Sequence, residues 1–348
     1  MRKIIFIAIF IISLVLSFSA VFAYNNETTH PSLTSEAIDF YNLYSDKKIT
    51  DQEKEWIIQG SILEDIEPRY INHFFDPIYK IGWTGEHAIF PQKTMQKLSE
   101  IFLSGENSVS ALNWVHNQEL QEKYKNYQGN RTWEKALYEY VKNKNRKQAF
   151  FNLGHVLHLI EDMAVPEHTR NDTHTPANES PYENYASQFN RNNFHIAGDL
   201  QKQNYQLLIL NSIDDYFEEL ANYSNNYFFS KDTINDVKYD KPKIVRSDDN
   251  FGYGIDKTHE EFPLVKKKIQ LINYKVEKIF FLNNNLNSYS ILDAYWTRLS
   301  RASILSGAGV IDLFFKEAEK AEKDPSLLKS SSEKFFSHFF NLWRNRKN

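Results

Sequence analysis

The chain has 348 residues, no cysteine and a formal net charge of −4 at pH 7. This mild acidity argues against non-specific binding to duplex nucleic acid, which depends on a basic surface. The lack of cysteine excludes disulfides and thiolate metal ligands. The length suffices for one large domain or two ordinary ones.

The first 23 residues have the features of an export signal. Arg2 and Lys3 precede an apolar run over residues 4–23, which ends in small residues that suit cleavage after Ala23. Cleavage would leave Tyr24 as the first residue, and the loss of two basic residues changes the net charge from −4 to −6. We therefore expect a secreted or periplasmic protein, although an uncut run of this length could span a bilayer.

The rest of the chain is poor in glycine and proline, and its apolar residues recur at helical spacing, which predicts an all-α fold. Thr34 is expected to cap one helix, and Thr50 with Glu53 forms a capping box for the next. In chain order, the expected helices cover residues 35–44, 51–63, 91–103, 108–123, 132–142, 146–165, 181–189, 199–229, 258–282 and 290–320.

These helices are expected to form one domain over residues 24–320, after the signal at 1–23. The polar segment 231–254 is interpreted as a surface excursion within that domain. Residues 321–348 form a polar linker and an amphipathic tail with a basic end, which either lies on an anionic membrane surface or packs on the body.

The most informative motif is His-x-x-x-Asp in the helix expected at 146–165. His158 and Asp162 are one helical turn apart and can face the same side. An isolated pair of this kind is usually only hydrogen-bonded. Here His168 follows after Pro166, and the same residue types cluster around His30 and from Asp65 to His73, so the sequence predicts a metal site. The two oxygens of Asp162 could bridge two ions.

This ordered series resembles the zinc-dependent phospholipase C family, which is related to the single-strand-specific zinc nucleases of fungi and plants. The resemblance covers about residues 29–185 and implies a multi-helix bundle with a metal cleft that holds two or three Zn²⁺ ions, three being favoured. The matching residues are His30, Asp65, His73, His158, Asp162 and His168.

The resemblance also implies how the ligands are shared. His73, His158, Asp162 and Asp65 would hold one zinc; His30, Asp162 and the backbone of Tyr24 a second; and His168, His174 and Glu183 a third. The family usually starts with Trp where this chain has Tyr24, and its last His and acid are four residues apart, whereas His174 and Glu183 are nine apart. Asp172 and Glu179 are therefore rival ligands, and His155 is expected behind the ligands or in the core.

The function implied is a phosphodiester hydrolase of phospholipase C type that acts through zinc-activated water. Asp65 would orient or deprotonate that water, or serve only as a ligand.

The alternatives are a single-strand nuclease or 3'-nucleotidase, for which Trp83, Tyr182 and Tyr185 could stack on bases, and a catalytically silent zinc-binding protein. The expected partners are a phospholipid or other phosphodiester and, transiently, a membrane surface, with no duplex nucleic acid; a monomer is expected. No alternating strand pattern is apparent after Lys231, so the β-sandwich of the family's toxins is expected to be absent.

Overall fold

The structure is a computed structural model that describes residues 25–66, 69–88, 91–102, 108–123, 129–174, 179–272, 275–282 and 289–328. The expected signal, Tyr24 and residues 329–348 of the tail lie outside the described residues. Among the helices that are described, none combines the length and the apolar character needed to cross a bilayer.

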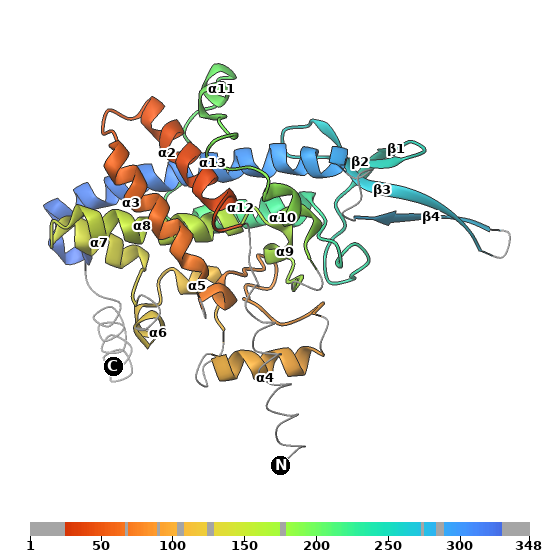
Figure 1. The fold of residues 1–348 in the computed structure, drawn as a ribbon, viewed down its shortest axis with the longest axis horizontal. Helices are drawn as coiled ribbons and strands as arrows, with labels where there is room; N and C mark the ends of the chain where they lie inside the picture. Colours follow the sequence, from red (N-terminus) through yellow and green to blue (C-terminus); the bar gives the residue numbers. More distant parts are fainter. Residues whose placement is uncertain are drawn as a thin grey trace, which may run out of the picture.

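The described chain is mainly helical, which confirms the expected all-α class (Figure 1). Short 3-10 turns cover Leu63–Asp65, Arg69–Asn72 and Pro325–Leu328. The helices are α2 (Thr29–Tyr44), α3 (Asp51–Ile62), α4 (Gln92–Phe102), α5 (Ala111–Trp114), α6 (Gln118–Lys123), α7 (Trp133–Val141), α8 (Arg146–Asp162), α9 (Pro166–Thr169), α10 (Pro181–Ala186), α11 (Ala197–Lys202), α12 (Ile213–Tyr227) and α13 (Tyr289–Lys323).

Local sequence signals set several helix ends. The capping box that opens α3 is present, because Thr50 Oγ1 accepts the backbone N–H of Glu53 and Glu53 Oε2 accepts that of Thr50. The expected cap at Thr34 is wrong, since α2 already begins at Thr29. The Thr34 hydroxyl instead donates to Glu161 Oε1 at 2.6 Å, which ties α2 to α8. A side chain that could cap a helix has thus become a buried tertiary contact.

Three expected helices are interrupted. The segment 108–123 forms the short helices α5 and α6, and 199–229 forms α11 and α12 with a loop over residues 203–212. The motif helix α8 ends at Asp162, and α9 starts at Pro166. Proline lacks a backbone N–H and clashes with the preceding turn, so it suits the first position of a new helix and not the interior of an old one.

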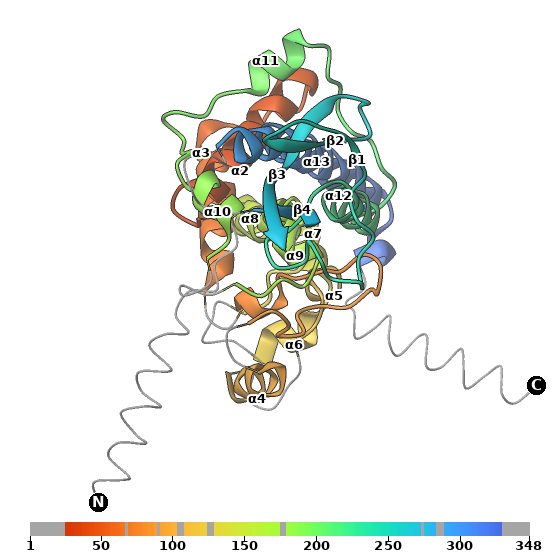
Figure 2. The same cartoon turned by 90° about the vertical axis from the view of Figure 1, so that its right-hand side faces the viewer.

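The segment 258–282, expected as a helix, is mostly a pair of antiparallel strands, so strands do occur after Lys231, where no alternating pattern was apparent in the sequence. Strands β1 (Ile244–Ser247), β2 (Phe251–Ile255), β3 (Glu261–Ile272) and β4 (Lys275–Phe281) form one sheet in that order. Half-buried and buried residues alternate along β2, and β3 packs against α13. Period-two burial of this kind marks a strand. The sheet extends away from the helices in Figure 1 and lies in front of them in Figure 2.

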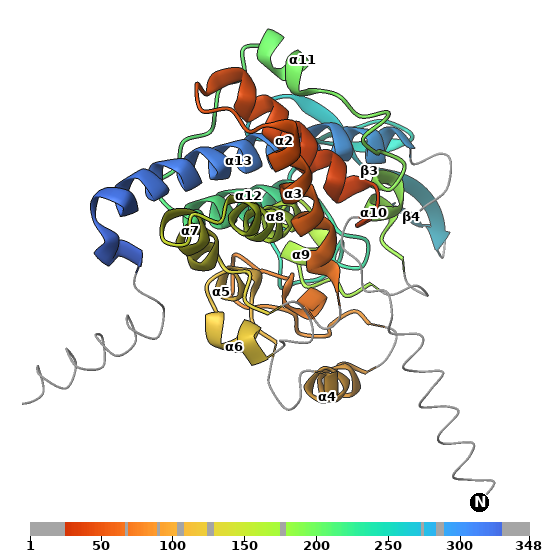
Figure 3. The ribbon, with the colours of Figure 1, turned by 60° about the vertical axis from the view of Figure 1, so that its left-hand side comes forward.

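Helix α8 lies in the middle of the helical body, packed by α2, α3, α7 and α13 (Figure 3). Its closest neighbour is α3, which it meets through two glycines. A Cβ atom on Gly60 would lie 1.9 Å from the carbonyl oxygen of Phe151, and one on Gly154 would lie 1.9 Å from that of Ile57. The two backbones are therefore in direct contact. This contact brings the carboxyl end of α3 and the turn Leu63–Asp65 against the second half of α8.

Candidate metal centre

The histidines and acids expected as ligands come from separate segments and meet in one buried region. They lie on α2, on the turn after α3 and the loop after Asn72, on α8, and on α9, α10 and the loop between them. Each is at most 7% exposed. The set comprises His30, Asp65, His73, His158, Asp162, His168, His174 and Glu183. The structure thus brings together all eight side chains that the sequence singled out as metal ligands.

Asp162 occupies the centre of this region. Its Oδ2 atom lies 3.0 Å from Nδ1 of His73 and 3.5 Å from Nε2 of His158. Its Oδ1 atom lies 3.6 Å from Nε2 of His30. The two oxygens of one carboxylate therefore face different imidazoles, which is the arrangement needed to bridge two cations.

Asp65 lies beside the same histidines. Its Oδ1 atom is 3.4 Å from His73 Nδ1 and 3.4 Å from His158 Nε2. The ring of His30 stacks on that of His158, with 3.6 Å between the ring centroids. Ligand atoms of His30, Asp65 and His158 lie within 4.8 Å of one another, and the same holds for His73, His158 and Asp162. Two adjoining groups of ligands thus share His158.

A third group forms from His168, His174 and Glu183. Glu183 Oε2 is 2.7 Å from Nε2 of His174, and Oε1 is 3.6 Å from Nε2 of His168. Of the two rivals, Asp172 accepts the backbone N–H of Asp232 at 2.9 Å, and Glu179 accepts from the side chain of Asn184. Glu183 is therefore the acid that faces both histidines, although nine residues separate it from His174.

The loop that carries His73 and the segment that carries His168 are fastened to each other. The backbone N–H of Phe75 donates to the carbonyl of His168 at 3.2 Å, and His168 Nδ1 bonds to the carbonyl of His73 at 3.1 Å. The ring of Phe74 stacks on His168 with 4.3 Å between centroids. This pairing places the third group next to the other two.

Four of the imidazole rings are held through Nδ1 by hydrogen bonds to protein oxygens. A histidine that donates from Nδ1–H keeps its lone pair on Nε2, which is the nitrogen available to a metal. His73 has the opposite orientation and turns Nδ1 toward Asp65 and Asp162. The four Nδ1 contacts are His30 to Glu161 Oε2 at 2.6 Å, His158 to Ser61 O at 2.7 Å, His168 to His73 O at 3.1 Å and His174 to Asp172 O at 3.2 Å.

The donor atoms fit zinc. Within the described part of the chain, the buried side-chain oxygens of Asp65 and Asp162, Nε2 of His158 and of His168, and Oε1 of Glu183 take part in no hydrogen bond. Buried polar atoms are rarely left in this state because each loses its hydration without compensation. Cations bound within the three groups would satisfy these atoms. Imidazole nitrogens and carboxylate oxygens without thiolates suit Zn²⁺.

Burial also governs the protonation of these groups. Loss of hydration, together with neighbouring imidazoles, lowers the pKa of His30 and of His168 well below its usual range. Loss of hydration raises the pKa of Asp162 and of Glu183, in part against the effect of nearby histidines. For His73 burial acts downward, but the carboxylate of Asp162 prevails and raises the pKa to about 10. Burial thus favours the neutral form of most of the expected ligands.

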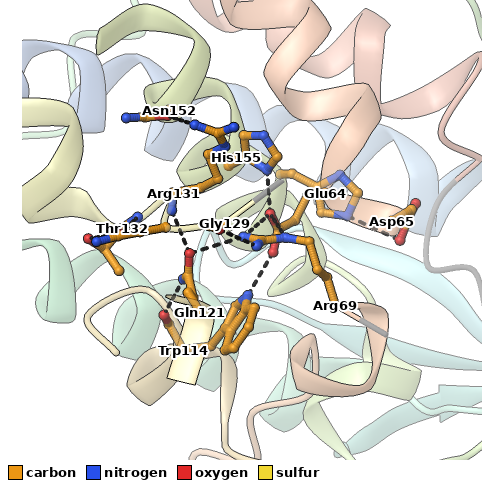
Figure 4. A network of polar contacts seen from close by, with 12 residues as sticks. Glu64, Asp65, Arg69, Trp114, Gln121, Gly129, Arg131, Thr132, Asn152 and His155 are labelled. Atoms are coloured by element: carbon orange, nitrogen blue, oxygen red, sulfur yellow. Dashed lines mark hydrogen bonds and ion pairs between the residues drawn. The ribbon is translucent and has the colours of Figure 1, made fainter. Parts of the chain in front are cut away.

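Sequence reasoning missed Glu64, which lies directly behind this region (Figure 4). Glu64 is fully buried and accepts hydrogen bonds from Arg69, Trp114 and His155. Burial would raise the pKa of Glu64, but the guanidinium of Arg69 and the bond from His155 hold it well below its usual range. His155 therefore lies behind the ligands, in one of the two places expected for it. The available signal was an acid next to Asp65 with an arginine five residues later.

The aromatic residues considered for base stacking differ in accessibility. Tyr182 is buried in the core and is 2% exposed. Trp83 is partly buried and donates Nε1–H to the Thr173 hydroxyl at 3.0 Å, and Tyr185 is partly buried and bonds to Asp293. Trp83 and Tyr185 thus keep some surface, whereas Tyr182 does not.

Neither a protein-family model nor a curated protein matches the chain. Similar solved structures include the alpha toxin of Clostridium absonum, at 14% identity and a TM-score of 0.42, covering 84% of this chain and 65% of the toxin. Alpha-toxin of an avian strain of Clostridium perfringens is 15% identical with a TM-score of 0.41, covering 84% of this chain and 64% of the toxin. The chain thus spans a little under two thirds of these toxins. In its ordered ligand series the chain resembles the zinc-dependent phospholipase C family.

Proposed function

We propose that the protein is a zinc-dependent phosphodiester hydrolase of phospholipase C type. The observation that carries this proposal is the pair of buried carboxylates, Asp65 and Asp162, which face imidazole nitrogens and accept no hydrogen bond within the described part of the chain. Cations bound between the ligands would compensate both carboxylates. The three groups of ligands support two or three zinc ions, and three are favoured.

The distances support a particular division of the ligands. His73, His158, Asp65 and Asp162 would hold one ion, because their facing atoms lie 3.0–3.5 Å apart. His30 would hold a second ion with the other oxygen of Asp162, together with the amino group of Tyr24 after cleavage of the signal. The third ion would be held by His168, His174 and Glu183.

When bound, zinc ions stabilise negative charge on phosphate oxygens and lower the pKa of bound water toward ~7. Asp65, Asp162 and Glu183 neutralise only about half of the charge of three such ions. The pocket therefore attracts a phosphodiester anion. Both oxygens of Asp65 are without donors, so this side chain can orient the attacking water and accept its proton.

The choice of a phospholipid as substrate rests on the family that the ligand series resembles. It implies release of a phosphorylated head group, transient contact with a membrane surface, secretion and action as a monomer. A single-strand nuclease or 3'-nucleotidase would use the same ligands, and a silent zinc-binding protein would keep them without turnover.

The test begins with the exported protein, whose first residue is sequenced and whose zinc is measured by elemental analysis. We expect Tyr24 at the start and two to three zinc ions per chain. The protein is then assayed on phosphatidylcholine vesicles and on single-stranded DNA, with Asp65→Asn as the inactive control, and we expect release of phosphocholine. Turnover of DNA alone would mean that the protein is a nuclease and not a phospholipase. Bound zinc without turnover of either substrate would refute the enzymatic activity. Absence of zinc would refute the whole proposal.

A further inference from the structure

His73 differs from the other histidines of the metal centre in the direction of its ring. Its Nδ1 atom lies 3.0 Å from Asp162 Oδ2 and 3.4 Å from Asp65 Oδ1. Its Nε2 atom points away from them, and the acidic oxygen beside it is Glu64 Oε1 at 3.6 Å. The other four rings bind protein oxygens through Nδ1. A protein group that fixes the orientation of the His73 ring must therefore lie beside Nε2 and not beside Nδ1.

Glu64 is itself held in place by several donors. Arg69 contacts Oε2 through Nε at 2.8 Å and Nη2 at 2.7 Å, and His155 Nδ1 bonds to the same oxygen. Trp114 donates to Oε1 at 2.7 Å. Arg69 is anchored in turn to the carbonyl of Gly129 at 3.0 Å (Figure 4). The carboxylate therefore cannot turn away from the ring of His73 without breaking these contacts.

We propose that Glu64 is a positioning residue that keeps the hydrogen of His73 on Nε2 and so leaves the lone pair on Nδ1, facing Asp65 and Asp162. This inference rests on the proposed zinc-dependent function. A carboxylate behind a ligating histidine fixes its tautomer and orientation and makes the other nitrogen a better ligand. At 3.6 Å the contact is longer than a hydrogen bond, so here it acts as electrostatic orientation of the N–H.

A different role would be the neutralisation of Arg69. A guanidinium buried without its carboxylate is strongly destabilising, whereas replacement of both partners by apolar residues is often neutral. The double variant Glu64→Leu/Arg69→Met removes the ion pair as a unit. Trp114 and His155 still lack their acceptor in this variant, so it should regain only part of the stability that Glu64→Leu loses. If neutralisation is the only role, zinc binding recovers with that stability. If Glu64 positions His73, zinc binding stays weak.

The matched control is the double variant Glu53→Leu/Arg146→Met. Glu53 is also a buried carboxylate bound to an arginine, with 2.7 Å from Arg146 Nε to Oε1, and it has no contact with the ligands. Thermal unfolding and zinc retention against a graded chelator are measured for the wild type, both double variants and Glu64→Leu. We expect about 10–100-fold weaker zinc retention in both Glu64 variants and wild-type retention in the control.

The tautomer supplies a second readout. In the zinc-loaded wild type labelled with ¹⁵N-histidine, the His73 signals, assigned by their loss in His73→Gln, should show a hydrogen on Nε2 and none on Nδ1. Wild-type zinc retention in Glu64→Leu/Arg69→Met, or a hydrogen on Nδ1 of wild-type His73, would overturn the positioning role. If the wild type itself holds no zinc, the proposed function fails instead, so the two failures are distinguishable.

Discussion

Nδ1 of His30 lies 2.6 Å from Oε2 of Glu161, the residue that immediately precedes Asp162 on α8. The same imidazole therefore contacts two consecutive carboxylates, one through each nitrogen. Glu161 is also the acceptor of the Thr34 hydroxyl. One buried acid thus joins α2 to α8 and orients the histidine closest to the amino-terminal end of the described chain.

This contact predicts the effect of Glu161→Ala. Without its oxygen partner the His30 ring can rotate or change tautomer, and we expect about 10–100-fold weaker retention of one zinc ion. Zinc per chain is measured during titration with a chelator, with Thr34→Val as a milder comparison, because that variant keeps the carboxylate. Unaltered retention in Glu161→Ala would contradict an orienting role for this acid.

Asp162→Asn should reduce zinc content and turnover together. The amide keeps the shape of the side chain but loses the charge and one of the two acceptor oxygens that face His73 and His30. The control is Asp172→Asn, a nearby buried acid that accepts a backbone N–H from Asp232. Metal analysis and a phosphodiester assay check both variants. Full zinc content and turnover in Asp162→Asn would remove the bridging role, and loss of zinc in Asp172→Asn would restore it as a rival ligand.

Asp65→Asn distinguishes a catalytic acid from a plain ligand. If Asp65 takes the proton of the attacking water, turnover should fall by about 10²–10⁴-fold. The remaining ligands of the same ion, His73, His158 and Asp162, should still retain most of the zinc. A parallel fall in zinc content and rate, repaired by excess zinc, would show that Asp65 acts only as a ligand.

Gly154→Ala should destabilise the protein strongly, because the added Cβ would lie 1.9 Å from the carbonyl oxygen of Ile57. Helices α3 and α8 would have to separate, at a cost of about 3 kcal/mol or more. Gly198→Ala is the control. It lies in α11 with nothing within 4 Å of an added Cβ, so it should gain about 0.5–1 kcal/mol. Chemical unfolding compares the two, and equal effects would contradict the close approach of the helices.

His116 predicts a pH dependence away from the metal centre. Burial lowers its pKa, but bonds to Asp214 at 2.8 Å and Glu134 at 2.7 Å prevail and raise it to about 9. A raised pKa in the folded state contributes stability that is complete below pH ~6.5 and is lost as the pH rises through about 9.

His116→Gln should therefore lower the free energy of unfolding at pH 6 by about 1 kcal/mol, since a third of the side chain is exposed and solvent screens the pair. The difference between the variant and the wild type should become small at pH 10. Chemical unfolding at both pH values measures it, and a difference independent of pH would refute the charged pair.

The sequence predicted which histidines and acids lie together, because metal binding needs particular side chains in a particular order. His158 and Asp162 meet because one helical turn separates them, a relation fixed by local geometry. The pairing of His174 with Glu183 could not be derived in this way, since it depends on how the loop returns to α10. Glu64 was missed for a similar reason: its partners Trp114 and His155 are distant in the sequence, and only the folded chain brings them together.

The fold was predicted less evenly. Helix α3 followed from its capping box, which is a local signal. The pairing of β3 with β4 was missed because their runs of lysine and apolar residues fit either periodicity over short stretches.

The contact between Gly60 and Gly154 has a consequence for how this protein can vary. Ser61, whose carbonyl orients His158, follows Gly60 directly, so any enlargement at these glycines would shift the ring of His158. In a library of random substitutions selected for turnover, both positions should accept as few replacements as the histidines themselves. The positions that accept few substitutions would then include the contact between α3 and α8 as well as the expected metal ligands.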